Sequence, residues 1–486
     1  MTEREKLAHL LRRFGLGASP AEMEQAEKKG MHGTIDRLLN YEGVDEEFPV
    51  SPWEFMFRPE NKLDLQAYNI TNYWALRLAL TKRPLQEKLA VFWHDHFAVS
   101  GSKVENGPML VRYVDMLRKH ANGNFRTLLG AVTKDPAMLR WLDGDVSIKG
   151  KPNENYAREV LELFTLGIGN YTEKDIRELA RAFTGWGLRP VIRGGREMET
   201  RRQIVECMEM DRPVVASSYS EELHDDGPKT ILGRTASFDT NSALDHIVSR
   251  PATAKYVTGK LWSFFAYPNP EPKVVERLAK VFVDKGYEIK PVLYAIATSK
   301  EFWSDKCVRR QVKSPMDFVV ASVRQLGIPE LVMAQRKPGV PPTEPIQGQL
   351  AQVANLVAGV MRRQGMRLLY PPDVAGWDWG EAWVAPAMMM DRMRFADVLT
   401  GQGRGGAAVN VLRDRIIAAK PEDSGQAVDA LLSVLDAPNI PERRALLIQA
   451  LDRAGGVASI EQQRTAPQTI RALAKLVFSM PEYQMC

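Results

Sequence analysis

The chain has 486 residues, which is long enough for one large domain or two domains of ordinary size. Its content of 44% hydrophobic and 26% charged residues is ordinary for a soluble globular protein. The net charge of +5 is small for this length and argues against the dense basic stripe of a dedicated nucleic-acid binder. No run approaches the roughly 18 apolar residues of a membrane span. We therefore expect no nucleic-acid partner and no membrane span.

The N-terminal stretch MTEREKLAHLLRRFGLG is charged and amphipathic, without the apolar core of a secretory signal. As written, the sequence predicts a cytoplasmic protein, or an exported one if a signal has been removed. Cys207, Cys307 and Cys486 match neither a disulfide framework nor a zinc motif. We expect free thiols, with Cys486 exposed.

Helical periodicity dominates the chain and predicts a mainly α protein. Gly, Pro, Asn and Asp separate the periodic stretches. In chain order these are LAHLLRRFGLG, LQEKLAVFWHDHF, MLVRYVDMLRKHA, AREVLELFTLG, IRELARAFTGW, ATAKYVTGKLWSFFA and VVERLAKVFVDKG.

The segment 188–236 differs, because it holds glycines, prolines and short alternating pieces such as RRQIVECMEM and RPVVASS. We interpret it as a small antiparallel β-hairpin insertion. Residues 401–426 are rich in Gly, Ala and charge and mark a weak boundary. The expected organisation is a helical core over residues 1–400, with a smaller helical segment, residues 401–486, packed on it.

The stretch FWHDHF places His94, Asp95 and His96 in an apolar run, where polar groups are costly to bury without partners. On an unbroken helix, residues two apart point to nearly opposite faces, so the histidines could not share a metal. If the helix unwinds after Trp93, an extended His-x-His could aim both rings at one ion. Joint metal ligation by His94 and His96, separate roles in a polar network, and two unrelated core histidines all remain open.

The stretch NENYAREVLELFTLG puts Arg158, Glu159 and Glu162 on one helical arc. Two carboxylates three residues apart can share a divalent cation or a catalytic proton. We take both glutamates as candidate metal ligands, Glu159 also as an acid or base, and Arg158 as a substrate contact. The alternative is a surface helix with an ion-pair ladder through Glu154, Arg158 and Glu162.

In HDDGPKTILG, His224 precedes a Gly-Pro turn and Lys229 follows it. Catalytic groups favour such loops. His224 is a candidate acid or base near neutral pH and Lys229 a candidate anion contact. The alternative is a turn whose aspartates cap its own backbone.

The stretch YPPDVAGWDWGEAW could form an aromatic wall from Trp377, Trp379 and Trp383, with Asp373 as its polar edge. Such a wall suits a sugar ring, although tryptophans also pack into loop cores. We expect the 370–383 loop to lie beside the histidine motif. We also expect His94 to face Glu159 and Glu162, with His96 in support and His224 near.

These motifs together resemble a bacterial family known as domain of unknown function 1800. The resemblance spans residues 7 to about 398 and extends to the terminal FSMPEYQ. It rests on LLRRFGLG, FWHDHF, NENYAREVLELFTLG, YTEKDIRELARAFTGW, HDDGPKTILG, VKSPMDFVVAS and LLYPPDVAGWDWGEAW, in that order. The family implies a mostly helical protein without an established activity, often encoded beside a sulfatase- or phosphatase-like protein. Many members carry an export signal, from which this sequence departs.

The leading hypothesis is a metal-assisted hydrolase or transferase that acts on an anionic or carbohydrate ester, such as a phosphate or sulfate. One divalent ion would lower the pKa of a bound water and polarise the ester. This reaction class depends on the family's genetic neighbour, and so on association. The alternative is a non-enzymatic helical scaffold or binding partner for the co-encoded sulfatase-like protein.

Overall fold

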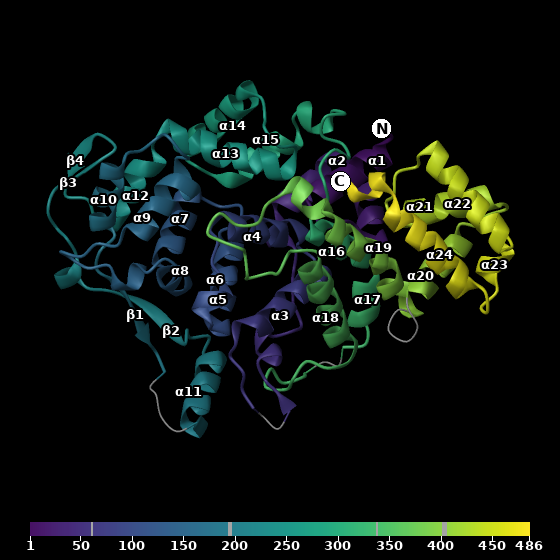
Figure 1. Cartoon of the computed structure of the whole chain (residues 1–486), viewed down its shortest axis with the longest axis horizontal. Coiled ribbons are helices and arrows are strands. Elements are labelled where there is room, and N and C mark those ends of the chain that lie inside the picture. Colours follow the sequence, from purple (N-terminus) through teal and green to yellow (C-terminus); the bar gives the residue numbers. More distant parts are fainter. Residues whose placement is uncertain (60–61, 193–196, 337–338, 401–405) are drawn as a thin grey trace.

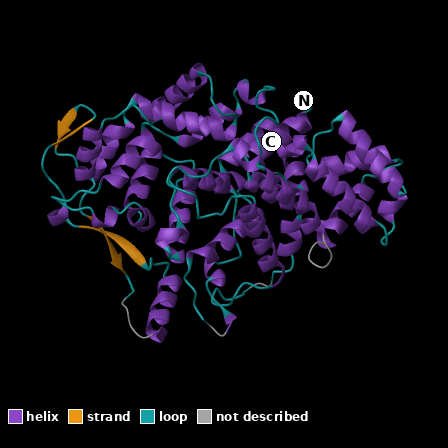
Figure 2. Cartoon of the chain, viewed as in Figure 1, coloured by secondary structure: helices purple, strands orange, loops and turns teal. Residues whose placement is uncertain are grey.

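The computed structural model describes residues 1–59, 62–192, 197–336, 339–400 and 406–486. Within these residues the protein is 63% helical, with 24 helices and two small antiparallel two-stranded sheets. This confirms the predicted mainly α fold with small β elements (Figure 2). Among the described residues, no helix has the length and apolar character that crossing a membrane requires.

The N-terminal third supplies the helices α1 (Glu3–Arg13), α2 (Pro20–Leu39), α3 (Ala67–Leu80), α4 (Pro84–His96), α5 (Gly101–Val104), α6 (Gly107–Lys119), α7 (Phe125–Lys134) and α8 (Pro136–Trp141). Of these, α4 lies at the centre of the molecule with helices on either side of it, and α7 and α8 lie towards the end that carries the sheets (Figure 1).

The next segment forms one end of the molecule, with both sheets at its edge (Figure 1). It contains α9 (Glu154–Glu159), the turn η5 (Val160–Thr165), α10 (Glu173–Ala182), β1 (Trp186–Pro190), α11 (Glu197–Glu209), β2 (Val215–Tyr219), β3 (Lys229–Ile231), β4 (Arg234–Ala236) and α12 (Thr240–Val248).

The predicted β insertion is present but is built differently from the single hairpin expected over 188–236. Strand β1 pairs with β2, and β3 pairs separately with β4, both antiparallel. The stretch RRQIVECMEM, interpreted as strand-like, lies almost wholly in helix α11. Ile204 and Cys207 are buried and three residues apart, which is helical rather than strand spacing. The alternation in its letters was therefore misleading.

The remaining helices complete the body and its opposite end. They are α13 (Pro251–Phe265), α14 (Pro272–Asp284), α15 (Ile289–Ala297), α16 (Pro315–Gln325), α17 (Ile328–Met333), α18 (Gly348–Arg363), α19 (Pro386–Thr400), α20 (Gly406–Ala418), α21 (Ser424–Val434), α22 (Pro441–Ala454), α23 (Ala458–Glu461) and α24 (Ala466–Ser479). Helices α20 to α24 gather at the end opposite the sheets, where α24 packs on α19 (Figure 1).

The C-terminus returns to the core. Met485 forms an isolated bridge with Val312, and the Cys486 amide donates to the Gln311 carbonyl at 2.8 Å. All three cysteines are free and buried. The expectation that Cys486 is exposed was therefore wrong, because its thiol packs inward and accepts a hydrogen bond from Arg13 at 2.9 Å.

Helix α4 lies at the centre of the molecule, and all 13 of its residues are buried. A helix apolar on every side would suit that position, but α4 carries charges at both ends. Near its start, Glu87 accepts from Arg77 and Arg118, and Lys88 donates to Asp317. Its last turn carries His94, Asp95 and His96, and the candidate site is built around them.

Candidate functional site

Helix α4 runs unbroken through both histidines and ends at His96. The two rings therefore point to different sides, as the helical alternative required. His94 packs among Trp74, Tyr113 and Trp377, whose ring stacks on it at 5.6 Å. His96 packs among Phe92, Phe97, Phe164 and Tyr256.

His94 is completely buried, and neither of its ring nitrogens makes a hydrogen bond of normal geometry. Burial lowers the pKa of His94 to about 3, against a weak opposing contact with the Val99 backbone. The ring is therefore neutral at physiological pH and sits in an aromatic cage.

His96 bonds through Nε2 to the Phe164 carbonyl at 3.0 Å. Burial, assisted by the charge of Lys260, holds the pKa of His96 well below its usual value. Thus His96, rather than His94, contacts the segment that carries Glu162, and the contact is with its backbone. This ring ties the end of α4 to η5.

Asp95, between the two histidines, is the group that joins α4 to the 370–383 loop. Its Oδ1 accepts from the Trp377 amide at 2.7 Å and its Oδ2 from Trp379 Nε1 at 2.8 Å. These bonds confirm the predicted placement of the loop beside the histidine motif. Gly376 makes the approach possible, because a Cβ there would lie 2.3 Å from Asp95 Oδ1, and its φ of +94° suits glycine.

The proton affinity of Asp95 is unusual for an aspartate. Burial raises the pKa of Asp95 to about 6, although the two hydrogen bonds and the charge of Lys260 oppose the shift. Burial in turn lowers the pKa of Lys260, which Asp95 partly restores. A carboxyl that exchanges its proton near neutral pH is suited to general acid–base chemistry.

Asp95 lines an open cleft of about 960 Å³ between α4, α13 and the segment 379–382. We call it the α4–α13 cleft. Aromatic rings form much of its wall: Phe92, Tyr256, Phe264 and Trp379. Phe264 packs edge-on against Trp379 with ring centroids 5.1 Å apart. Its cationic residues are Lys255, Lys260 and Arg310, and Glu381 lies at its edge. Aromatic faces beside charged groups can hold and orient a ligand that has both apolar and ionic parts.

Of the three tryptophans predicted to form the wall, Trp379 lines the cleft, whereas Trp377 and Trp383 are buried. Trp377 is 5% exposed and stacks on His94, so its ring belongs to the core beneath the loop. Trp379, two residues on, is half-buried and lines the cleft. The tryptophan cluster therefore divides between packing and lining.

The predicted carboxylate stripe lies where α9 passes into the π-helical turn η5. Leu166 donates to the Leu161 carbonyl at 3.0 Å, five residues back, which is the wider spacing of that turn. Such turns recur at functional sites. Glu159 closes α9 and Glu162 lies within η5.

Glu162 and Asp373 both act electrostatically on Glu159. Burial raises the pKa of Glu159 to about 6, with Glu162 and Asp373 adding to the shift and Arg158 opposing it. Asp373 also raises the pKa of Asp95, so its carboxylate lies within electrostatic range of both groups. Glu162 accepts from the Tyr171 hydroxyl at 2.5 Å, and Asp373 caps its own loop at the Ala375 amide.

Arg158 is engaged in ion pairs on the surface. It donates to Glu173 through both terminal nitrogens, at 2.8 and 2.9 Å, and lies 3.7 Å from Glu154. This is part of the ion-pair ladder considered as the alternative, extended to α10. In this arrangement its charge faces Glu173 rather than a substrate.

His224 and Lys229 belong to a tightly bonded turn beside α10. His224 Nδ1 lies 3.0 Å from the Thr184 carbonyl, and its ring contacts Tyr219. Lys229 is 1% exposed and donates to the carbonyls of Asp225 and Gly227. Both residues therefore form hydrogen bonds that hold the turn. None of these bonds involves the residues that contact His94 and His96.

In the part of the chain that the structure describes, no three His, Cys, Asp or Glu side chains converge in an arrangement that could hold a metal ion. The divalent ion stays a prediction. Asp95 and Lys260 were not among the residues predicted from the sequence to form the site. The FWHDHF motif did contain a signal for Asp95. Three consecutive polar residues point to different sides of a helix, so Asp95 needed a bonding partner separate from those of the two histidines.

A family model described as "Protein of unknown function (DUF1800)" matches residues 9–485, nearly the whole chain. Comparison with curated proteins and with solved structures found no match.

Proposed function

Since the chain belongs to the DUF1800 family, whose function is unknown, we propose from its own geometry that it is a hydrolase or transferase. Its substrate would be an anionic or carbohydrate ester bound in the α4–α13 cleft. The observation that carries this proposal is Asp95, a buried carboxyl on the wall of a large cleft with its pKa raised to about 6.

In this proposal Asp95 moves the proton. Its carboxylate form takes a proton from a water or acceptor hydroxyl as that oxygen bonds to the ester centre. The carboxylic acid then returns the proton to the departing ester oxygen as its bond breaks. Trp377 and Trp379 hold both carboxyl oxygens, so the group is oriented before substrate binds. Lys260 offsets negative charge that develops beside it.

The cleft wall supports the substrate class. Lys255, Lys260 and Arg310 outnumber Asp95 and Glu381, so an anionic group is favoured there. Trp379 and Phe264 offer apolar faces of the kind on which sugar rings pack.

The divalent ion stays in the proposal with Glu159 and Glu162 as its predicted ligands, and the described residues offer no group of three His, Cys, Asp or Glu side chains to complete the site. An ion at the two glutamates would relieve the repulsion that helps to raise the pKa of Glu159. Elemental analysis of protein purified without chelator tests this directly. About one metal per chain, lost in a Glu159→Gln and Glu162→Gln double variant, is the expected result, and a metal-free protein would remove the ion.

Activity is tested on 4-nitrophenyl phosphate, sulfate, acetate and glucoside. We expect turnover of at least one ester, reduced about 100-fold or more by Asp95→Asn. Asp378→Asn is the matched control, because Asp378 is exposed in the same loop and its substitution is chemically identical. Absence of turnover by folded wild-type protein, or equal rates in the Asp95 variant, would refute the proposal.

A scaffold that binds a co-encoded sulfatase-like protein is the second candidate. It is favoured by His94, His96, His224 and Lys229, whose buried positions serve packing and local bonds. Co-expression with the sulfatase-like protein, followed by size-exclusion chromatography, distinguishes the two proposals. A stable complex that hydrolyses none of the test esters supports the scaffold.

A further inference from the structure

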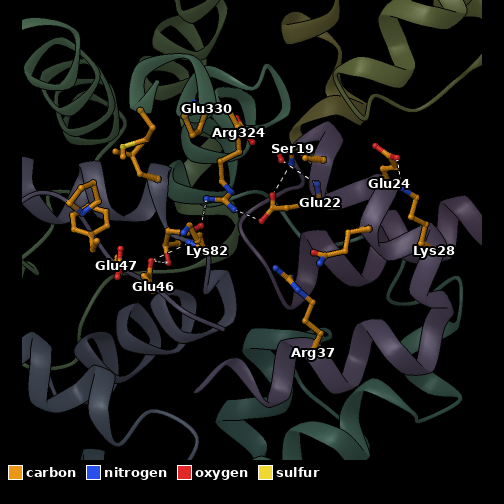
Figure 3. Close-up of a pocket in the computed structure, with 18 residues that line it drawn as sticks. Ser19, Glu22, Glu24, Lys28, Arg37, Glu46, Glu47, Lys82, Arg324 and Glu330 are labelled. Atoms are coloured by element: carbon orange, nitrogen blue, oxygen red, sulfur yellow. Dashed lines mark hydrogen bonds and ion pairs between the residues drawn. The ribbon is translucent and has the colours of Figure 1, made fainter. Parts of the chain in front are cut away.

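A second cavity, of about 670 Å³, lies on another part of the molecule (Figure 3). It is bounded by α2, the end of α3, the loop 46–49, α16 and α17, and shares no lining residue with the α4–α13 cleft. This volume is within the range of small-molecule sites. We call it the α2–α17 cavity.

The lining of the α2–α17 cavity is largely apolar. Carbon-rich side chains come from four separate segments of the chain: Ala21, Phe48, Pro49, Leu80, Pro329 and Met333. Water in contact with such a lining is readily displaced by an apolar body of matching size.

Arg324 from α16 is the buried cation of this cavity. It is 3% exposed, and its Nη1 donates to the carbonyls of Ala79 at 3.0 Å and Thr81 at 2.9 Å. Its Nη2 donates to Glu22, while Nε has no hydrogen-bond partner in the described structure. The guanidinium is thus fixed in place, its charge is paired with that of Glu22, and its unbonded Nε is buried.

Arg37 and Lys82 add positive charge that the described residues do not neutralise by an ion pair. Figure 3 shows the Arg37 guanidinium pointing from α2 into the hollow, towards the side where Lys82 and Arg324 lie. Arg37 is half-buried, so its charge acts at reduced dielectric.

The carboxylates of the same lining are largely occupied. Glu22 pairs with Arg324, and Glu24 pairs with Lys28 at 2.6 Å. Glu46 lies 3.6 Å from Arg77 and 4.0 Å from Arg83, and it accepts from the Thr81 hydroxyl and the Lys82 amide. Glu47, Glu330 and Lys82 are exposed, where water screens their charges. The half-buried charge of the lining that forms no ion pair within the described residues is therefore that of Arg37.

We infer that the α2–α17 cavity binds an amphipathic anion, with a carboxylate or phosphate head at Arg37 and the exposed Lys82, and an apolar body against Phe48, Leu80 and Met333. The site is separate from the proposed ester chemistry and stands whether or not that chemistry is found. A charged head matched to Arg37 and a tail matched to the apolar lining are both required.

Calorimetric titration of the full chain tests this with octyl phosphate and octanoate, and with octyl glucoside as a neutral probe of the same tail. We expect at least one anion to bind and the glucoside to bind at least tenfold more weakly. Arg37→Gln should weaken binding of the anion about tenfold, since a charge-assisted hydrogen bond is lost. Lys29→Gln, on an exposed position of α2 outside the cavity, should leave it unchanged.

A second variant guards against indirect effects. Ala21→Trp fills the cavity from an exposed position of α2 and should abolish binding of the anion while the unfolding midpoint holds. Arg324 is left intact, because it bonds the end of α3. Equal binding of octyl glucoside, unchanged affinity in Arg37→Gln, or no binding of either anion would overturn the inference.

Discussion

Helix α4 carries two buried carboxylates with opposite properties. Burial alone would raise the pKa of Glu87, but Arg118 and Arg77 lower it to about 2. Two turns later, burial raises the pKa of Asp95 to about 6, with only Lys260 and two neutral donors in opposition. The same helix therefore holds one carboxylate locked in its charged form and one poised to exchange a proton.

The difference lies in the partners and not in the degree of burial. Glu87 faces two guanidinium groups and Trp74 Nε1, so its charge is matched and directly bonded. Asp95 receives neutral donors, which orient a carboxyl without fully compensating its charge. A matched buried ion is a structural element, whereas an undercompensated one beside a cleft is a candidate for chemistry.

The largest expected effect comes from neutralising the matched carboxylate. Glu87→Gln leaves Arg77 and Arg118 buried around an amide, and loss of one partner from a buried ion pair costs about 3–5 kcal/mol. We expect a loss of that size in the free energy of unfolding, measured by urea titration. Asp115→Asn is the control, because Asp115 pairs with Arg118 from a more exposed position and should cost less. Equal costs would show that burial of Glu87 is not decisive.

Gly376→Ala tests the connection between Asp95 and the loop. The new Cβ would meet Asp95 Oδ1 at 2.3 Å and must also adopt a φ of +94°, so we expect a loss on the order of 1–3 kcal/mol. Gly380→Ala is the control, since it also has positive φ but an added Cβ there meets nothing within 4 Å. If both variants lose the same free energy of unfolding, the cost comes from the positive φ alone, and contact of the new Cβ with Asp95 adds nothing.

How far the sequence could anticipate these features follows from the range of the interactions involved. Helical periodicity is local, and it correctly predicted α4 and the mainly α fold. The choice between an unbroken and an unwound end of α4 needed the structure, because packing on Phe164 and Trp377 lies outside the motif. The role of Asp95 depends on Trp377 and Trp379, 282 and 284 residues away in the chain.

The same reasoning explains why other candidate residues could be named but not placed. The sequence predicts the turn that carries His224 and Lys229 but not its hydrogen bonds, so His224 was a candidate acid or base and Lys229 a candidate anion contact. In the structure His224 bonds to Thr184, and Lys229 donates to the carbonyls of Asp225 and Gly227. The sequence spacing of the tryptophans at positions 377, 379 and 383 does not indicate which of their rings faces the core. Trp377 does so, and Trp379 lines the cleft.

The pH dependence of stability separates the two carboxylates further. The folded pKa of Asp95 is about 6, above the usual value of 3.8, so its stabilising contribution is present below pH 3.8 and is lost as pH rises through 6. Asp95→Asn removes that loss. We therefore expect the stability of the variant relative to wild type to improve between pH 4 and pH 7, by on the order of 2 kcal/mol.

The comparison must be made as a difference between proteins, because His94 and His96 act in the opposite direction over part of this window. Their depressed pKa values give stability that is present above pH 6.5 and is lost as pH falls. Both proteins are therefore unfolded with urea at several pH values. The contribution of the histidines is common to both and cancels in the difference between their free energies of unfolding. A difference that does not change with pH would show that Asp95 is ionised at an ordinary pKa.

The smallest expected effect comes from Trp379→Phe, which keeps an aromatic ring in the cleft and removes one donor to Asp95. Hydrogen bonds to charged groups are worth about 1.5–3 kcal/mol, and partial access to water at the cleft places this one at the low end. The loss should be felt at pH 8, where Asp95 is charged, and should shrink at pH 5, where it is protonated. Because the donor favours the carboxylate, its removal should also raise the pKa of Asp95 further.

If the proposed ester hydrolysis is found, the acid-side inflection of its pH–rate profile should therefore move to higher pH. Trp303→Phe, which removes an indole donor to the Ala297 carbonyl, is the control for losing a tryptophan bond elsewhere. A stability loss in Trp379→Phe that is the same at pH 5 and pH 8 would mean that the indole acts by packing, and that the orientation of Asp95 depends on the Trp377 amide alone.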